Sequence, residues 1–168
     1  SLAETDYTFG FDTAVNVATE CIDRLHTTAE SHHRIVVIEV MGKYTGWIAV
    51  EAGIAGGADI ILVPEFPIEL DRVCTSLKNR HKRGKTFSII VVSEGAQIKG
   101  LQEELGVGHN GVKIGELLAR LIEEKTGYET RVSVLGHILR GGTPTAYDRV
   151  VATRFGFKAV DLVKERHF

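Results

Sequence analysis

The chain of 168 residues is 43% hydrophobic and 25% charged, which is typical of a folded globular domain and excludes a disordered segment. Its 20 basic and 22 acidic residues leave a formal net charge of −2, which excludes the strong positive field of a protein that binds nucleic acid or anionic membranes through charge alone. No apolar run reaches the roughly 18 residues of a membrane span, and two cysteines build no disulfide framework, so we expect a cytoplasmic protein.

Hydrophobic periodicity predicts helices and strands in alternation. Apolar residues at three- and four-residue spacing predict a helix over 10–28, and the β-branched run 34–39 predicts a buried strand. The same patterns predict helices over 45–55, from 70 toward 84, from 114 toward 127 and over 146–168, and strands at 60–63, 87–92 and 131–135. Because helices separate the strands, we expect a single α/β domain over 1–168, with a mostly parallel sheet covered by helices on both faces.

The ends of the chain suggest a longer protein. The first residue is Ser1 rather than Met, and the helix over 146–168 stops without a glycine cap or a following proline. We therefore expect a fragment.

Four loops are candidate binding segments, because ligands of parallel sheets bind beyond the carboxyl ends of the strands. They are 40–43, 64–67, 93–95 and 136–142, and three of them combine glycine with a charged or imidazole side chain.

In 136–142, His137 and Arg140 stand before two glycines and offer donors suited to phosphate oxygens. Glu94 is an acceptor suited to sugar hydroxyls, and Met41-Gly42-Lys43 offers close backbone approach beside a cation. Together the loops predict a site for a phosphorylated polyol.

Each of these segments has a plainer alternative. The loop 136–142 can be a structural turn, and Glu94 a solvated acid. Arg131 opens its strand about four residues' rise from the loop, which favours a role in the site of a neighbouring chain.

Other motifs carry less weight. The G-x-G-x-x-G at 106–111 has no strand leading into it and is interpreted as a loop and helix cap, and 79–86 lacks the first glycine of a phosphate loop. The adjacent His32 and His33 cannot chelate one metal comfortably if they enter a strand. The basic cluster over 78–85 is interpreted first as the solvated end of a helix and second as an anion site for an effector.

Several blocks resemble the 6-phosphofructokinase family. The most specific covers 131–149, with Arg131, Gly136-His137, Arg140-Gly141-Gly142 and Asp148-Arg149, and the others lie at 5–14, 31–34, 39–43 and 54–57. The form of 41–47 and the long 95–111 segment are similar to the branch that includes pyrophosphate-using members.

The resemblance implies a phosphotransferase of glycolysis that moves a phosphoryl group from ATP or pyrophosphate, with Mg²⁺, to the 1-hydroxyl of fructose 6-phosphate. It also implies an allosteric homotetramer of identical subunits. This chain would be the sugar-phosphate-binding half of one such subunit. The nucleotide loop and the aspartate general base of the family are absent, so the chain alone is expected to be inactive and to bind no cofactor or metal. The alternative is a stand-alone sugar-phosphate-binding or regulatory module.

The resemblance further implies residue roles. Arg34 and Arg131 are implied to bind the sugar 6-phosphate in a neighbouring subunit, and His137 and Arg140 to bind it within their own. The other implied roles are sugar contact for Met41 and Gly42, hydroxyl binding for Glu94, contact with the transferring phosphoryl group for Lys43, and effector binding for Asp59, Arg83 and Lys85.

Overall fold

The computed structural model describes residues 5–100 and 113–167. Within them, four strands pair in parallel into one sheet of order β2-β3-β1-β4. The strands are β1 (Ile35–Val40), β2 (Ile60–Leu62), β3 (Ser88–Ser93) and β4 (Thr130–Val134). The expected α/β fold with a parallel sheet is confirmed.

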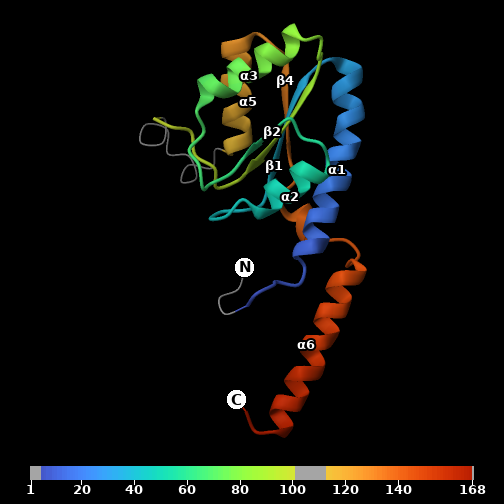
Figure 1. Cartoon of the computed structure of the whole chain (residues 1–168). Helices are drawn as coiled ribbons and strands as arrows, with labels where there is room; N and C mark the ends of the chain where they lie inside the picture. The colour runs from blue at the N-terminus through green and yellow to red at the C-terminus, as the bar shows by residue number, and fades with distance from the viewer. Residues whose placement is uncertain (1–4, 101–112, 168) are drawn as a thin grey trace.

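Helices cover both faces of the sheet (Figure 1). Alternate residues of β1 and β3 pack against α3 and α5 on one face and against α1 and α2 on the other, so the molecule has two apolar cores. This is the consequence of period-two side-chain alternation in strands buried on both faces. The helical elements are α1 (Phe11–His32), α2 (Trp47–Ala55), α3 (Leu70–Lys82), α5 (Ile114–Thr126), the 3-10 helix η1 (Gly136–Arg140) and α6 (Ala146–Lys164).

The two central strands send the chain to opposite faces. β1 leads to α2 on one face, whereas the helix that follows β3 in the described residues, α5, lies on the other. Open α/β sheets bind ligands beyond the carboxyl ends of neighbouring strands whose connections diverge in this way. We call this place in the molecule the β1–β3 crevice.

Two elements differ from the sequence prediction. Helix α1 continues to His32 rather than ending near residue 28, because Ala29 packs into the core beneath the sheet, and the helix ends where His33 adopts a left-handed conformation (φ 53°). His32 and His33 therefore do not enter a strand. The segment predicted as a loop after β4 is the single helical turn η1, with Leu139 buried as its anchor.

Helix α6 projects away from the sheet and the helices that cover its two faces (Figure 1). Its first turn is fixed to α1: the buried carboxylate of Asp148 accepts hydrogen bonds from the backbone N–H of Thr13 (2.8 Å) and from the Thr13 hydroxyl. Beyond that turn, most apolar side chains of α6 are exposed, including Phe157 and Val163. None of the described helices is both long and apolar enough to cross a membrane.

We predict that Asp148→Ala destabilises the fold in a pH-dependent way. Burial acts to raise the pKa of Asp148, but hydrogen bonds from Thr13 and from the backbone at Gly10 outweigh it and hold that pKa below its usual value. The carboxylate therefore adds stability above about pH 4, and this contribution is lost as the pH falls through the lower native pKa. At pH 7, Asp148→Ala should lower the free energy of unfolding by about 2 kcal/mol, measured by urea denaturation.

The exposed acid Asp161 on the same helix supplies the control, since Asp161→Ala should change the free energy of unfolding by less than about 0.5 kcal/mol. Equal losses in the two variants, or a difference that does not shrink as the pH falls below about 4, would contradict this account of Asp148.

Candidate functional site

The loop after β1 is held against the end of β3. The Glu94 carboxylate accepts a hydrogen bond from the Gly42 N–H (3.2 Å), and the Ser93 hydroxyl donates one to the Gly42 carbonyl (2.7 Å). The Gly95 N–H donates to the same carbonyl (3.0 Å). The structure thus brings Glu94 together with Met41-Gly42-Lys43 at the crevice between β1 and β3, as the sequence predicted.

Two glycines make this close approach possible. Gly42 has a φ of 145°, and a Cβ there would lie 2.3 Å from the Ser93 hydroxyl oxygen. A Cβ on Gly95 would lie 1.9 Å from the Lys43 carbonyl oxygen. Any side chain at either position displaces the loop, so the sequence must have glycine at both.

Lys43 presents a positive charge at the rim of the crevice. Its side chain is exposed, with the ammonium 5.5 Å from the centroid of the Tyr44 ring, a cation–π arrangement. Tyr44 itself is 80% exposed. The lysine therefore has one exposed aromatic contact and remains open to an anionic ligand.

The residues His137 and Arg140 lie at the same edge of the sheet, because β4 is paired with β1 and η1 follows β4 directly. Both side chains are exposed, while Leu139 between them is buried. Gly136 (φ 49°) and Gly142 (φ 88°) allow the chain to turn into and out of this segment. The turn thus points an imidazole and a guanidinium outward from a fixed apolar anchor.

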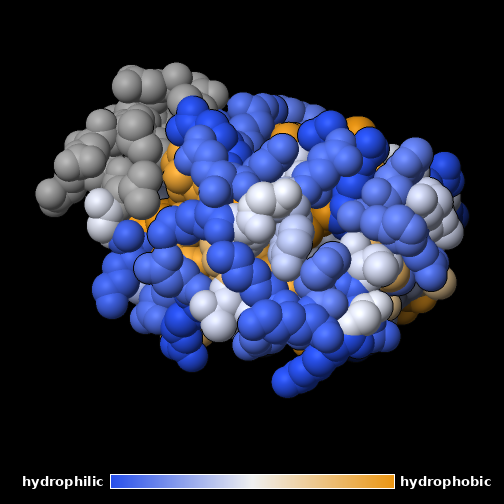
Figure 2. Space-filling view, turned by 90° about the horizontal axis from the view of Figure 1, so that it is seen from above, coloured by the Kyte–Doolittle hydropathy of each residue, from blue (hydrophilic) through white to orange (hydrophobic). Residues whose placement is uncertain are grey.

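Arg34 and Arg131 lie at the opposite edge, where the strands begin. They share one carboxylate: Arg34 Nε is 2.8 Å from Glu129, and Arg131 forms an ion pair with the other oxygen of Glu129. The hydrogen bond from Arg34, together with the charge of Arg131, holds the pKa of the Glu129 carboxyl below its usual value. The face above the strand beginnings is predominantly hydrophilic (Figure 2). Because Arg34 and Arg131 lie where the strands begin, the structure does not bring them together with His137 and Arg140 at the strand ends.

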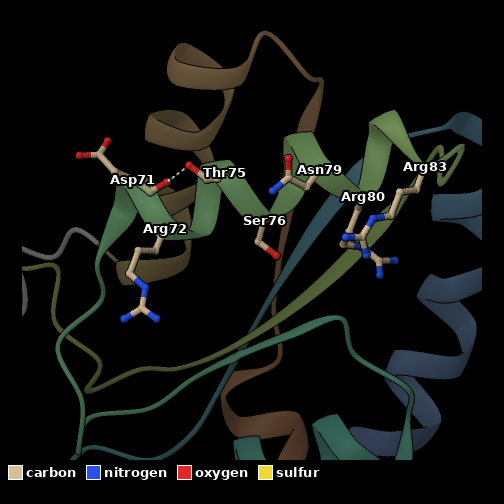
Figure 3. A pocket seen from close by; sticks show the side chains of 7 residues that line it. All are labelled: Asp71, Arg72, Thr75, Ser76, Asn79, Arg80 and Arg83. Carbon is tan, nitrogen blue, oxygen red and sulfur yellow. Dashed lines mark hydrogen bonds between the residues drawn. The ribbon is translucent and has the colours of Figure 1, made fainter.

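The three residues implied to bind an effector also lie near the strand beginnings, each in different surroundings. The Asp59 carboxylate contacts Arg80 (2.6 Å) and accepts the Ile89 N–H (2.9 Å). Arg83 lines an open cavity of about 490 Å³ along α3, where its side chain points the same way as that of Arg80 (Figure 3). Lys85 lines a separate cavity of about 170 Å³.

Two carboxylates near the crevice lie in segments that the sequence analysis named, 64–67 and 39–43, but it assigned neither side chain a role. Glu65, after β2, accepts the Gly46 N–H at the far end of the loop that follows β1. Glu39 is buried in β1 and accepts the Gly115 N–H (2.8 Å) at the start of α5; burial raises its pKa. Both contacts join segments far apart in the sequence, so a single-sequence pattern cannot reveal them.

Within residues 5–100 and 113–167, no group of three or more histidine, cysteine, aspartate or glutamate side chains is placed to hold a metal ion. The glycine-rich stretch 106–111 lies outside the described residues.

Comparison with known families matches the sequence model described as "Phosphofructokinase" over residues 1–163. The chain belongs to the phosphofructokinase family.

Curated relatives of this phosphofructokinase-family chain include enzymes named for two phosphoryl donors. A pyrophosphate–fructose 6-phosphate 1-phosphotransferase from Amycolatopsis mediterranei is 55% identical over 99% of the chain and 51% of its own length. An ATP-dependent 6-phosphofructokinase from Chloroflexus aurantiacus is 54% identical over 95% of the chain and 45% of its own length. The chain thus spans about half the length of these relatives.

A solved structure supports the same assignment. The phosphofructokinase of Saccharomyces cerevisiae matches with a TM-score of 0.83 and 38% identity, covering 97% of this chain and 21% of that one. The family resemblance of the sequence is confirmed.

We predict that Gly95→Ala disrupts the crevice of this phosphofructokinase-family chain. The added methyl group collides with the Lys43 backbone, so residues 42 and 43 must move and the free energy of unfolding should fall by about 1–3 kcal/mol. Urea denaturation measures the loss, and amide chemical shifts locate the movement.

Gly156→Ala is the matched control, because a Cβ there meets nothing within 4 Å on the helix α6. It should leave the fold unchanged or stabilise it by up to about 1 kcal/mol. Unshifted amides at residues 42 and 43 in Gly95→Ala would contradict the packing described for this loop.

Proposed function

We propose that this chain is the fructose-6-phosphate-binding half of a glycolytic 6-phosphofructokinase, cytoplasmic in location, which transfers a phosphoryl group to the 1-hydroxyl of the sugar phosphate. The observation that carries the proposal is the meeting of the Glu94 carboxylate with the Gly42 backbone at the β1–β3 crevice. Cationic residues lie at this same edge, which is the chemistry that a phosphorylated polyol requires.

In this proposal, His137 and Arg140 bind the 6-phosphate of the sugar in their own subunit. Glu94 has a second carboxylate oxygen for a sugar hydroxyl while its first holds the Gly42 N–H. Lys43 neutralises charge on the transferring phosphoryl group, which is the main protein contribution in phosphoryl transfer.

Arg34 and Arg131 are proposed to bind the 6-phosphate in the crevice of an adjacent identical subunit. Their place at the strand beginnings supports this role, because a five-residue strand keeps its two ends about 16 Å apart. The parent enzyme would then be a homo-oligomer with twofold interfaces.

The donor site and the general base are proposed to lie in sequence beyond this chain. The chain spans about half of its relatives, and the apolar side chains of α6 lie exposed where further protein would cover them. The relatives include both pyrophosphate- and ATP-named enzymes at nearly equal identity, so the donor is either one. The described residues offer no donor set for Mg²⁺, and we assign that ion no ligand here.

An effector response through Asp59, Arg83 and Lys85 is also part of the proposal. Arg83 and Lys85 are exposed cations near the strand beginnings and remain available to an anion. Asp59 would act indirectly, through its ion pair with Arg80.

We predict that the 168-residue chain alone has no phosphofructokinase activity, because it lacks the donor site and the general base. The assay contains fructose 6-phosphate, Mg²⁺ and either ATP or pyrophosphate, with a vector-only preparation as the control. Turnover above that control would refute the division of labour proposed for the two halves.

In the full-length protein, His137→Ala and Arg140→Ala should each raise the KM for fructose 6-phosphate roughly 10–150-fold, since each removes a hydrogen bond to a charged group worth about 1.5–3 kcal/mol. The KM for the donor should stay unchanged. The matched variant His32→Ala, at the other edge of the sheet, should leave the KM values for both substrates unchanged. An unchanged sugar KM in both variants would show that the phosphate is bound elsewhere.

A further inference from the structure

The helix α2 begins without a cap of its own. Gly46 is its N-cap residue and has no side chain, and the first turn contains no acidic residue. In a capping box, a glutamate or glutamine at the third helical position accepts the N–H of the N-cap residue. Here that position is Ala49, so the sequence of α2 offers no such partner.

The Glu65 carboxylate, from the segment that follows β2, accepts the N–H of the N-cap residue instead. Both oxygens of Glu65 accept the Gly46 N–H, at 2.9 and 3.2 Å. Glu65 follows β2, nineteen residues further along the chain. Its negative charge also lies at the amino end of α2, where the helix dipole favours an anion.

The approach of Glu65 is close because Gly46 has no side chain. A Cβ at Gly46 would lie 2.3 Å from the Val63 side chain and 3.1 Å from the nearer Glu65 oxygen. Gly46 is buried as a result. The segment that follows β2 and the start of α2 therefore pack closely at Gly46.

The loop after β1 is thus held by a carboxylate at each end. Glu94 accepts the N–H of Gly42, and Glu65 accepts the N–H of Gly46. Lys43 lies between these two anchors. Its own contact is the ring of Tyr44, which is itself exposed, so the backbone of the loop rather than side-chain packing determines where the ammonium stands.

We propose that Glu65 is a positioning residue of the phosphoryl-transfer site: by holding the Gly46 N–H, it fixes the far end of the loop and with it the place of Lys43. The inference rests on the proposed function. Glu65 contacts a backbone N–H and no reacting group, so it acts through the loop rather than on the substrate. Proper placement of a charged group is the kind of effect that costs activity when lost, even from a remote contact.

The first experiment tests the brace itself in the 168-residue chain, without substrate. Hydrogen exchange of the Gly46 amide should accelerate in Glu65→Ala, and the fluorescence anisotropy of Trp47, the one tryptophan of the sequence, should fall. Glu65→Gln keeps a carbonyl oxygen as acceptor and should resemble the wild type. Glu51→Ala, an exposed acid on the same helix, is the control and should also match the wild type.

The second experiment measures the consequence in the full-length protein. Glu65→Ala should lower kcat roughly tenfold, because Lys43 acts on the transferring group. The KM for fructose 6-phosphate should change by less than about threefold, because His137 and Arg140 bind the phosphate of the sugar. Glu65→Gln should recover most of the rate, and Glu51→Ala should keep all of it.

The two experiments separate this inference from the proposed function. If the wild type shows no phosphofructokinase activity, the proposed function fails, and with it the catalytic role of Glu65, whatever the exchange data show. If the wild type is active but Glu65→Ala keeps its kcat, or Gly46 exchange is unchanged, the positioning role of Glu65 is wrong. A tenfold loss of kcat that Glu65→Gln does not recover would also overturn it.

Discussion

The length of the central β-strands limits how the proposed sugar-phosphate site can be built. Each of the central strands is six residues long, so the carboxyl edge of the sheet lies about 20 Å from the edge where the strands begin. Cations stand at both edges: Lys43 and Arg140, beside His137, at the first, and Arg34 and Arg131 at the second. One small phosphate cannot contact both sets within one chain. Two copies facing each other across a twofold axis can satisfy this constraint, because each copy then supplies what the other lacks.

Carboxylates hold neighbouring groups at both edges of the sheet. At the carboxyl edge, Glu94 and Glu65 each accept a loop N–H, whereas at the other edge Glu129 lies between two arginines. Glu39 likewise accepts a backbone N–H, that of Gly115 at the start of α5. A hydrogen bond from a neutral N–H to a carboxylate is stronger than one to a neutral acceptor, so few contacts suffice to fix a loop that must stay open to ligand. The Lys43 ammonium, whose contact is the ring of Tyr44, stays exposed in this arrangement.

The sequence predicted the order and type of the described elements, because long runs with period two or 3.6 depend on local burial alone. It also predicted that Arg131 lies at a different edge from His137, since position along a strand is a local property. It named the segments that contain Glu65 and Asp148 but not the roles of these carboxylates, which depend on which distant N–H lies within reach in the folded chain. The end of α1 was misjudged for a related reason: Ala29 is a weak signal by itself and extends the helix only because the sheet buries it. Predictions that rest on the periodicity of long segments therefore succeeded. Hydrogen-bond partners far apart in the sequence could not be predicted in this way.

The central claim, that each sugar-phosphate site combines residues from two subunits, is tested most directly by mixing two inactive full-length variants. Arg131→Ala damages the arginine that a subunit lends, and Glu94→Ala damages the crevice that receives it. After the two variants are unfolded together and refolded, some crevices contain an intact Glu94 and receive an intact Arg131 from the partner. The account predicts activity well above that of either variant refolded alone. Hybrid oligomers that form but remain as inactive as their parents would contradict it.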